Sequence, residues 1–357
     1  MTALAAALAL SLSACGGGSG PGGSAPASLD PDADLSEQRL TVSNWDGYLP
    51  EDLPARFKSA VGPPVTVAKH TTNEEIVAKL TASSDSGIDV AFVSGQYAQA
   101  LAAQGLLEPI HHDLVPHLRN LDPLASRLAH DKGNAYSVPY TWGTTGLCYR
   151  KDLVRDAPDS WNDLLKPRAE LKKKITMLKT ERWLFLPAQK SLGYSVNTTD
   201  DQQLARVKEL LLDAKQGLLA YDDTTFGDRL KSGEAVLAEA WDGWCPTDDK
   251  RIAFTVPKEG SDLWVDTMVV LKSSKSKEAA HAFINYVLGA DVHSWVASNI
   301  YYKVPNAAAM AEVDPALLKK YPALAMTPEQ LLKGESAVDL GDASAAYSRI
   351  VTEVTAG

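Results

Sequence analysis

Aromatic and acidic side chains recur together at three places in the chain. These places are Trp45 to Tyr48, Trp241 with Asp242, and Trp264 with Asp266. An aromatic face attracts a cation by about 0.5–2 kcal/mol. A carboxylate about 4 Å away adds about 4 kcal/mol at an effective dielectric of about 20, before desolvation is subtracted. The pattern therefore indicates a site for a desolvated ammonium group, although tryptophans also pack in cores and line sugar sites.

Motifs for other chemistry are absent from the sequence. There is no nucleophile elbow, phosphate-binding loop or zinc-binding H-E-x-x-H helix. His111, His112 and His117 fall in a polar, proline-bounded stretch, which favours a solvated loop over a metal site. The formal net charge of −10 disfavours nucleic acid as a partner. We therefore expect no enzyme activity, no cofactor and no metal.

The first residues read as an export signal. An apolar run over residues 3–13, too short to span a bilayer, ends in the sequence LSAC at 12–15, which resembles a bacterial lipobox. A positively charged start is missing. We expect a signal peptide over residues 1–14, acylation of Cys15 and a flexible Gly/Ser/Pro-rich linker over 15–37. The protein would then be extracytoplasmic and anchored to the membrane through lipid.

Strands and helices are expected to alternate after this linker. Short apolar runs predict strands near 40–42, 65–67 and 88–93, and helical periodicity predicts helices near 73–80, 97–104, 200–211 and 277–288. Asn73 is a candidate N-cap. With 357 residues and 45% hydrophobic content, the chain suits about two α/β domains with parallel sheet.

Several motifs, in family order, resemble the spermidine/putrescine-binding proteins of ABC importers. They are NWDGYLP at 44–50, SVPYTWGTTG at 137–146, SWNDLLKP at 160–167, LGYS at 192–195, NTTD at 197–200, PKEG at 257–260 and WVD at 264–266. The resemblance spans essentially the whole mature domain. It implies a receptor that captures a polyamine or related small organic cation and delivers it to permease subunits, working as a monomer.

The resemblance also implies an α/β, two-lobed periplasmic-binding-protein fold with crossing hinge strands and an interlobe ligand cleft. Lobe 1 would comprise residues 38–138 and 267–304, and lobe 2 residues 139–266 and 305–355. Cys148 and Cys245, the two cysteines of the mature globular region, lie in second-lobe segments that this fold brings near the cleft. A disulfide between them is expected, with two free thiols as the alternative.

Ligand-binding residues carry over from the family unevenly. The matching positions are Trp45, Tyr48, Ser94, Trp241, Trp264 and Asp266. The departures are Gln96 for a family Tyr, Asp242 for a neutral residue, and Thr180 and Trp183 for an acidic pair. Loss of that pair favours a compact amine over a long polyamine, unless Glu181 or Asp242 supplies the second charge.

Other ligands on the same fold stay open at this point. A sugar, a carboxylate or iron are alternatives to an organic cation. Arg182 lies beside the altered positions, and it would favour a zwitterionic amine if its side chain entered the cleft.

Overall fold

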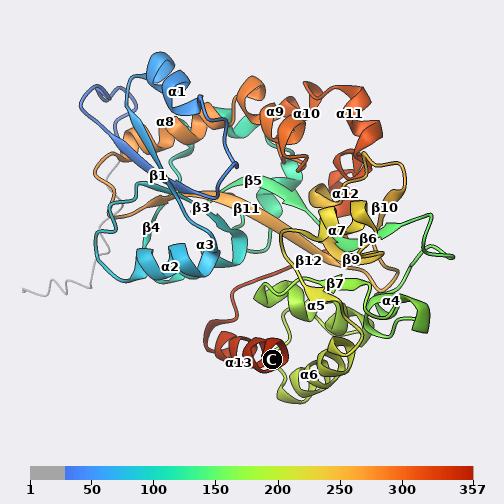
Figure 1. Ribbon diagram of the computed structural model, residues 1–357. Coiled ribbons are helices and arrows are strands. Elements are labelled where there is room, and N and C mark those ends of the chain that lie inside the picture. Colours follow the sequence, from blue (N-terminus) through green and yellow to red (C-terminus); the bar gives the residue numbers. More distant parts are fainter. Residues whose placement is uncertain (1–28, 357) are drawn as a thin grey trace, which may run out of the picture.

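The computed structural model describes residues 29–356 and folds them into two lobes, each built on its own sheet (Figure 1). The expected signal peptide and Cys15 lie outside the described residues. Residues 29–37 form turns without helix or strand, and Leu35 packs against the first-lobe core. Within residues 29–356, no helix combines the length and the apolar character needed to cross a membrane.

A seven-stranded sheet forms the first lobe in the order β12-β11-β3-β1-β2, with β4 and β5 also paired to β11. Its strands are β1 (Leu40–Asn44), β2 (Val65–Lys69), β3 (Val90–Ser94), β4 (Leu107–Glu108), β5 (Val138–Gly143), β11 (Asp262–Leu271) and β12 (Glu335–Ser336). β1 is parallel to β2 and β3, as predicted, whereas β11 runs antiparallel to β3, β4 and β5. All five residues of β3 are buried, as the unbroken apolar run requires.

Helices cover this sheet on both faces and enclose two hydrophobic clusters. The first-lobe helices are α1 (Leu53–Val61), α2 (Asn73–Thr81), α3 (Gly95–Ala103), α8 (Lys277–Val287), α9 (Ala290–Asn299) and α10 (Ala307–Ala311). Short 3-10 helices connect them: η1 (His112–Leu114), η2 (Pro116–Asn120) and η3 (Pro123–Arg127). The histidine-rich stretch falls in η1 and η2, and the described residues contain no group that could hold a metal ion.

A five-stranded sheet forms the second lobe in the order β10-β6-β9-β7-β8. Its strands are β6 (Thr145–Arg150), β7 (Ile175–Met177), β8 (Ala220–Tyr221), β9 (Leu237–Trp241) and β10 (Ile252–Thr255). Its helices are α4 (Trp161–Leu165), α5 (Glu181–Ser191), α6 (Asp201–Lys215), α7 (Phe226–Ser232) and α13 (Ser344–Thr355), with 3-10 helices η4 (Ala169–Leu171), η5 (Asp242–Trp244) and η7 (Gly341–Ala343). Asp200 caps α6 through the N–H of Gln203, which fixes the predicted helix start.

Two segments cross between the lobes: one consists of β5 followed by β6, and the other is β11. β5 ends at Gly143 and β6 begins at Thr145, so Thr144 alone separates a first-lobe strand from a second-lobe strand. β11 returns in the opposite sense, and Figure 1 shows it running from beside β12 to beside β4. Ser261, just before β11, donates a 2.6 Å hydrogen bond to the carbonyl of Thr145. These crossing strands place residues of both lobes side by side.

The last part of the chain packs on both lobes. α10 lies against α9, with Ala309 in the first-lobe core, whereas α13 packs on α5 and α6. Between them lie α11 (Pro315–Lys320), η6 (Pro322–Ala325) and α12 (Pro328–Leu331). Leu331 also belongs to the first-lobe core. β12 still belongs to the first-lobe sheet through its pairing with β11, so in the division that we propose the chain returns to lobe 2 after β12 rather than at residue 305.

Candidate functional site

Asp266 is the centre of a group of hydroxyl donors at the junction of the lobes. Its Oδ1 accepts a 2.7 Å hydrogen bond from Ser94 Oγ, and its Oδ2 accepts bonds from Tyr48 OH at 2.7 Å and Thr141 Oγ1 at 3.4 Å. The side chain keeps intermediate exposure. Burial raises the pKa of Asp266, and these three hydroxyls oppose the rise because they stabilise the carboxylate. We call Tyr48, Ser94, Thr141 and Asp266 the first-lobe site.

Asn73 holds Ser94 of the first-lobe site in position through two hydrogen bonds. Asn73 Nδ2 donates to Ser94 Oγ over 3.0 Å, and Asn73 Oδ1 accepts from the Ser94 N–H over 2.9 Å. The expectation that Asn73 caps a helix was wrong, because Thr72 is the N-cap of α2 and accepts from the N–H of Glu75. Asn73 instead fixes Ser94, so that the serine hydroxyl hydrogen is free to point at Asp266.

Aromatic rings surround this carboxylate. Trp45 meets Tyr48 edge-on with ring centroids 5.4 Å apart, and Trp264 meets Tyr302 at 4.8 Å. Tyr302 is buried and lies 6.1 Å from the Tyr48 ring. Burial raises the pKa of Tyr302 well above its usual value, and the nearby charges of Asp242 and Asp266 add to the rise. Tyr302 therefore lies near both carboxylates.

Asp242 is bound to the segment that crosses between the lobes. Its Oδ2 accepts from the Thr144 N–H at 3.2 Å, and its Oδ1 accepts from the Gly243 N–H at 2.9 Å. Burial raises the pKa of Asp242 to about 7. Trp264 and Asp242 both press on Gly143, where an added Cβ would stand 2.2 Å from the Trp264 ring and 2.6 Å from Asp242 Oδ1. Only glycine allows both side chains to reach this point.

In the second lobe, Trp183 and Trp241 form an edge-on pair with ring centroids 5.6 Å apart. Trp183 Nε1 donates a 2.9 Å hydrogen bond to Oδ2 of Asp262, whose Oδ1 accepts from the Thr145 N–H at 2.9 Å. Burial raises the pKa of Asp262. Asp262 therefore brings a carboxylate to Trp183, the residue that we expected at a position of the family's acidic pair.

The remaining candidates at this end have other roles. Thr180 Oγ1 donates to Asp223 at 3.1 Å, and Glu181 accepts from Ser348 at 2.6 Å. Arg182 donates to the carbonyls of Val338 and Val196, both at 2.9 Å. The guanidinium thus ties α5 to neighbouring second-lobe backbone, which removes the reason to expect an anionic group on a ligand.

Gln96 lies at the start of α3, beside the first-lobe site. Its side chain is buried and makes no hydrogen bond to another residue of the 29–356 range. The structure therefore brings together Trp45, Tyr48, Ser94, Trp264 and Asp266, and separately Trp183 with Trp241. Asp242 stands between the two groups, next to Trp264.

Cys148 and Cys245 are joined by a disulfide with Cα atoms 5.7 Å apart. The bond links β6 to the residue that follows η5. Since η5 begins at Asp242, directly after Trp241, the disulfide anchors the segment that carries both candidate ligand-binding residues.

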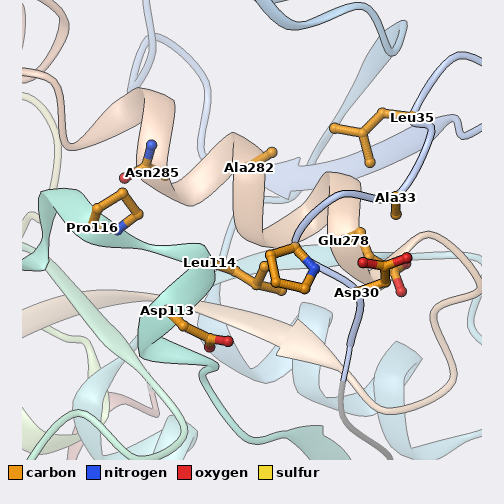
Figure 2. A pocket seen from close by; sticks show the side chains of 10 residues that line it. Asp30, Ala33, Leu35, Asp113, Leu114, Pro116, Glu278, Ala282 and Asn285 are labelled. Atoms are coloured by element: carbon orange, nitrogen blue, oxygen red, sulfur yellow. The ribbon is translucent and has the colours of Figure 1, made fainter.

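Two cavities are lined by residues other than Asp266 and Asp242. One of about 220 Å³ separates residues 30–35 from α8, η1 and η2 (Figure 2), and it is lined by Asp30, Pro31, Ala33, Leu35, Asp113, Leu114, Pro116, Glu278, Ala282 and Asn285. A second of about 260 Å³ lies beside Thr144, between the loop before β11 and α12. Neither includes an aromatic side chain, and neither includes Asp266 or Asp242, so the candidate site rests on the side-chain contacts above.

Sequence reasoning missed Thr141, Tyr302, Asp262 and Glu239, a buried residue of β9. One signal was available for Asp262. It stands two residues before Trp264 and four before Asp266, so all three side chains leave the same face of β11. No sequence pattern distinguished Tyr302 from a tyrosine that packs in the core.

Comparisons with known proteins agree with this architecture. Residues 53–326 match the family described as bacterial extracellular solute-binding protein. The spermidine/putrescine-binding periplasmic protein of Salmonella typhimurium is 31% identical over 318 residues, covering 88% of this chain and 90% of the relative.

Solved structures give the same result. A lipoprotein of Treponema pallidum superposes with a TM-score of 0.79 at 26% identity, covering 88% of this chain and 99% of that one. A spermidine/putrescine transporter substrate-binding protein of Streptococcus pneumoniae, solved with calcium and HEPES, gives 0.76 at 25% identity, covering 89% and 98%. The chain belongs to the bacterial extracellular solute-binding proteins, the receptors of ABC importers.

Proposed function

We propose that this receptor captures a small organic cation, and that Asp266 binds its ammonium group. The observation that carries the proposal is the first-lobe site. A carboxylate of intermediate exposure, held by hydroxyls on β3, β5 and the loop after β1, lies at the junction of the lobes among aromatic rings. The hydroxyls orient the carboxylate, and its exposed part stays available to a ligand.

The energetics favour a cation at this place. Each aromatic face contributes about 0.5–2 kcal/mol to an ammonium group placed over it. A carboxylate in a partly buried site pairs strongly with a cation. An anion at the same place would be repelled by the negative charge of Asp266, with little screening by water. The names of the relatives support the same class of ligand, since the Salmonella protein is a spermidine/putrescine-binding protein.

The second lobe limits the length of the amine that the site can hold. Trp183 fills volume beside Trp241, where the family carries an acidic residue. We therefore expect a compact amine such as putrescine to bind at least about tenfold more tightly than spermidine.

Isothermal titration calorimetry tests this function on the purified protein. The panel consists of putrescine, spermidine, n-butylamine, γ-aminobutyrate and glucose, and native mass spectrometry of the freshly purified protein looks for a bound solute. We expect the compact amines to bind and glucose to give no heat. A panel in which glucose binds and no amine does would contradict the proposal.

The same proposal includes where the receptor is attached and which proteins it meets. Acylation of Cys15 would hold the receptor on the outer face of the cytoplasmic membrane, with the Gly/Ser/Pro-rich residues between Cys15 and the packed residues 29–37 as a tether. The Treponema relative is named a lipoprotein, which supports this arrangement. The partners would be the permease subunits of the importer, engaged by a monomer.

A further inference from the structure

Two consecutive residues of β5 hold Tyr48 of the first-lobe site at its two ends. The Tyr140 hydroxyl donates a 2.5 Å hydrogen bond to the backbone carbonyl of Tyr48, and Thr141 Oγ1 lies 2.9 Å from the Tyr48 hydroxyl. Tyr48 in turn donates to Oδ2 of Asp266 over 2.7 Å. Because a tyrosine has only one hydroxyl hydrogen, Thr141 must be the donor in its contact with Tyr48. Tyr140 therefore influences Asp266 through Tyr48.

An irregularity in β5 explains how both side chains reach the same tyrosine. Asp266 of β11 lies opposite Thr141, but the next residue, Thr267, lies opposite Pro139, so Tyr140 is an extra residue without a partner on β11. Consecutive side chains of a regular strand leave opposite faces, whereas a bulge of this kind turns a side chain in a new direction. The bulge therefore turns Tyr140 toward the loop that carries Tyr48.

Tyr140 is itself fixed by a buried histidine of α9. The carbonyl of Tyr140 lies 2.8 Å from His293 Nε2, and the two rings are stacked with centroids 5.1 Å apart. The Asn306 amide group lies 3.2 Å from His293 Nδ1 through its Nδ2 atom, which can only donate. Nδ1 is thus the acceptor, and Nε2 carries the hydrogen that binds Tyr140. Burial lowers the pKa of His293 to about 4, so this neutral form persists at neutral pH.

The loop around Tyr48 has little other polar support from within the protein. No backbone N–H in residues 29–356 donates to the Tyr48 carbonyl. The ion pair between Asp46 and Lys69 is exposed, and exposed ion pairs contribute little to stability. The Tyr140 hydroxyl is therefore the buried donor that sets where the backbone of Tyr48 lies.

We propose that Tyr140 is a positioning residue for ligand capture: by holding the Tyr48 carbonyl, it directs the Tyr48 hydroxyl at Asp266. This rests on the proposed function, in which Asp266 binds the ammonium group. Tyr140 has 0% exposure, so it acts on the ligand without contact. The bulge in β5 exists next to the site for this purpose, because a regular strand would turn Tyr140 away from Tyr48.

The arrangement has a consequence for the charge of Asp266. Burial raises its pKa, and the hydrogen bond from Tyr48 opposes the rise. The neighbouring hydroxyls of Tyr48, Tyr140 and Tyr302 have pKa values well above their usual range, so they stay protonated at neutral pH. Asp242, with a pKa of about 7, is common to every variant below. A misdirected Tyr48 therefore raises the pKa of Asp266, and the affinity for an ammonium group is lost at a higher pH on acidification.

Tyr140→Phe tests the proposal because it removes the hydroxyl and keeps the ring. In calorimetry at pH 7, we expect it to lower putrescine affinity about fivefold, the effect of one lost hydrogen bond. Tyr347→Phe is the matched control. It removes a buried hydroxyl that donates over 2.7 Å to the carbonyl of Thr198 in the second lobe, and it should keep wild-type affinity. Thermal unfolding of both variants shows that they are folded.

A double-mutant cycle separates positioning from a merely structural role. Tyr48→Phe should weaken binding, and adding Tyr140→Phe to it should change the affinity by less than about twofold, because Tyr140 acts through the lost hydroxyl. Additive losses in the double variant would overturn the proposal, as would wild-type affinity in Tyr140→Phe.

The pH dependence of binding gives a second readout. In titrations from about pH 5 to pH 8, putrescine affinity of Tyr140→Phe should begin to fall at a pH about half a unit higher than that of the wild type. A merely structural role would lower affinity equally at every pH, and that result would contradict positioning. Failure of every amine to bind the wild type would instead overturn the proposed function.

Discussion

Asp242 is the first residue of η5 and Asp262 is the first residue of β11, yet they accept hydrogen bonds from adjacent peptide groups of the crossing segment, the N–H of Thr144 and the N–H of Thr145. Both carboxyl groups are buried. Any change in their protonation therefore acts on the junction between β5 and β6.

This relationship predicts a pH dependence of stability. The pKa of Asp242 is raised from 3.8 to about 7. Between about pH 4 and pH 7 the folded chain keeps a proton that the unfolded chain has lost, so the free energy of unfolding falls as pH rises. At about 1.36 kcal/mol per unit, the upper limit is about 4 kcal/mol.

Thermal unfolding of the free protein from pH 5 to pH 8 measures the effect. The wild-type Tm should fall with rising pH, and Asp242→Asn should flatten the slope. Asp262, Asp266 and Glu239 act in the same direction, so the slope should shrink without disappearing. Asp213→Asn on α6 is the control and should keep the wild-type slope. An unchanged slope in Asp242→Asn would contradict the role of this group.

Asp266→Asn should weaken amine binding by at least roughly a hundredfold. Removal of one partner from a buried ion pair commonly costs about 3–5 kcal/mol. The amide also turns an N–H₂ group toward hydroxyls that donate to the carboxylate in the wild type. Calorimetry with putrescine reports the change, and Asp213→Asn again serves as the control. Wild-type affinity in Asp266→Asn would show that the ammonium binds elsewhere.

Gly143→Ala should lower ligand affinity without any change in charge. The new Cβ would meet the Trp264 ring at 2.2 Å and Asp242 Oδ1 at 2.6 Å, so at least one of these side chains must shift. Gly227→Ala on α7 is a matched control, because its Cβ finds the nearest atoms at 3.7 Å. We expect at least a tenfold loss of putrescine affinity in the first variant and none in the second. Equal affinities would mean that Trp264 and Asp242 do not shape the site.

The disulfide between Cys148 and Cys245 should be present in the purified protein. Alkylation of the denatured, unreduced protein followed by peptide mapping should find both cysteines unlabelled, and reduction should expose both. Because the bond closes a loop across 97 positions, Cys245→Ser should lower stability by about 2–4 kcal/mol. Two labels without reductant would rule the bond out.

Cys15→Ala should release the protein from the membrane. The prediction comes from the LSAC sequence at 12–15. Cell fractionation with immunoblotting measures the distribution, and mass spectrometry of the wild-type N-terminal peptide looks for the acyl chains. Cys15→Ala that stays in the membrane fraction would refute the lipid anchor.

The main elements of the fold were predictable because their signals are local. The apolar run of β3, the capped start of α6 and the amphipathic pattern of α8 lie within short windows, and the structure places each where the pattern predicted it. Asn73 shows the limit of a local rule. Its residue type suits a helix cap, but its side chain instead makes two hydrogen bonds with Ser94, 21 positions away in the sequence.

The candidate site was predictable only in part. The residue order of the family and the two-residue spacing of Trp264 and Asp266 indicated a carboxylate beside an aromatic ring, with Tyr48 and Ser94 among the expected site residues. The structure shows both hydroxyls bound to this carboxylate and adds that of Thr141. The role of Arg182 depended on where its side chain turns. That direction is set by two backbone carbonyls that no sequence pattern reveals.

By itself, the sequence determined the alternation of strands and helices and the association of carboxylates with tryptophans, because these are properties of neighbouring residues. Tertiary structure alone decided which carboxyl groups are buried and what each one binds. Glu239 reads as one acidic residue in an apolar strand. Its Oε1 has no hydrogen-bond partner among residues 29–356, because Leu178, directly after β7, packs around it with Tyr221 of β8 and Asp262 of β11 and excludes water.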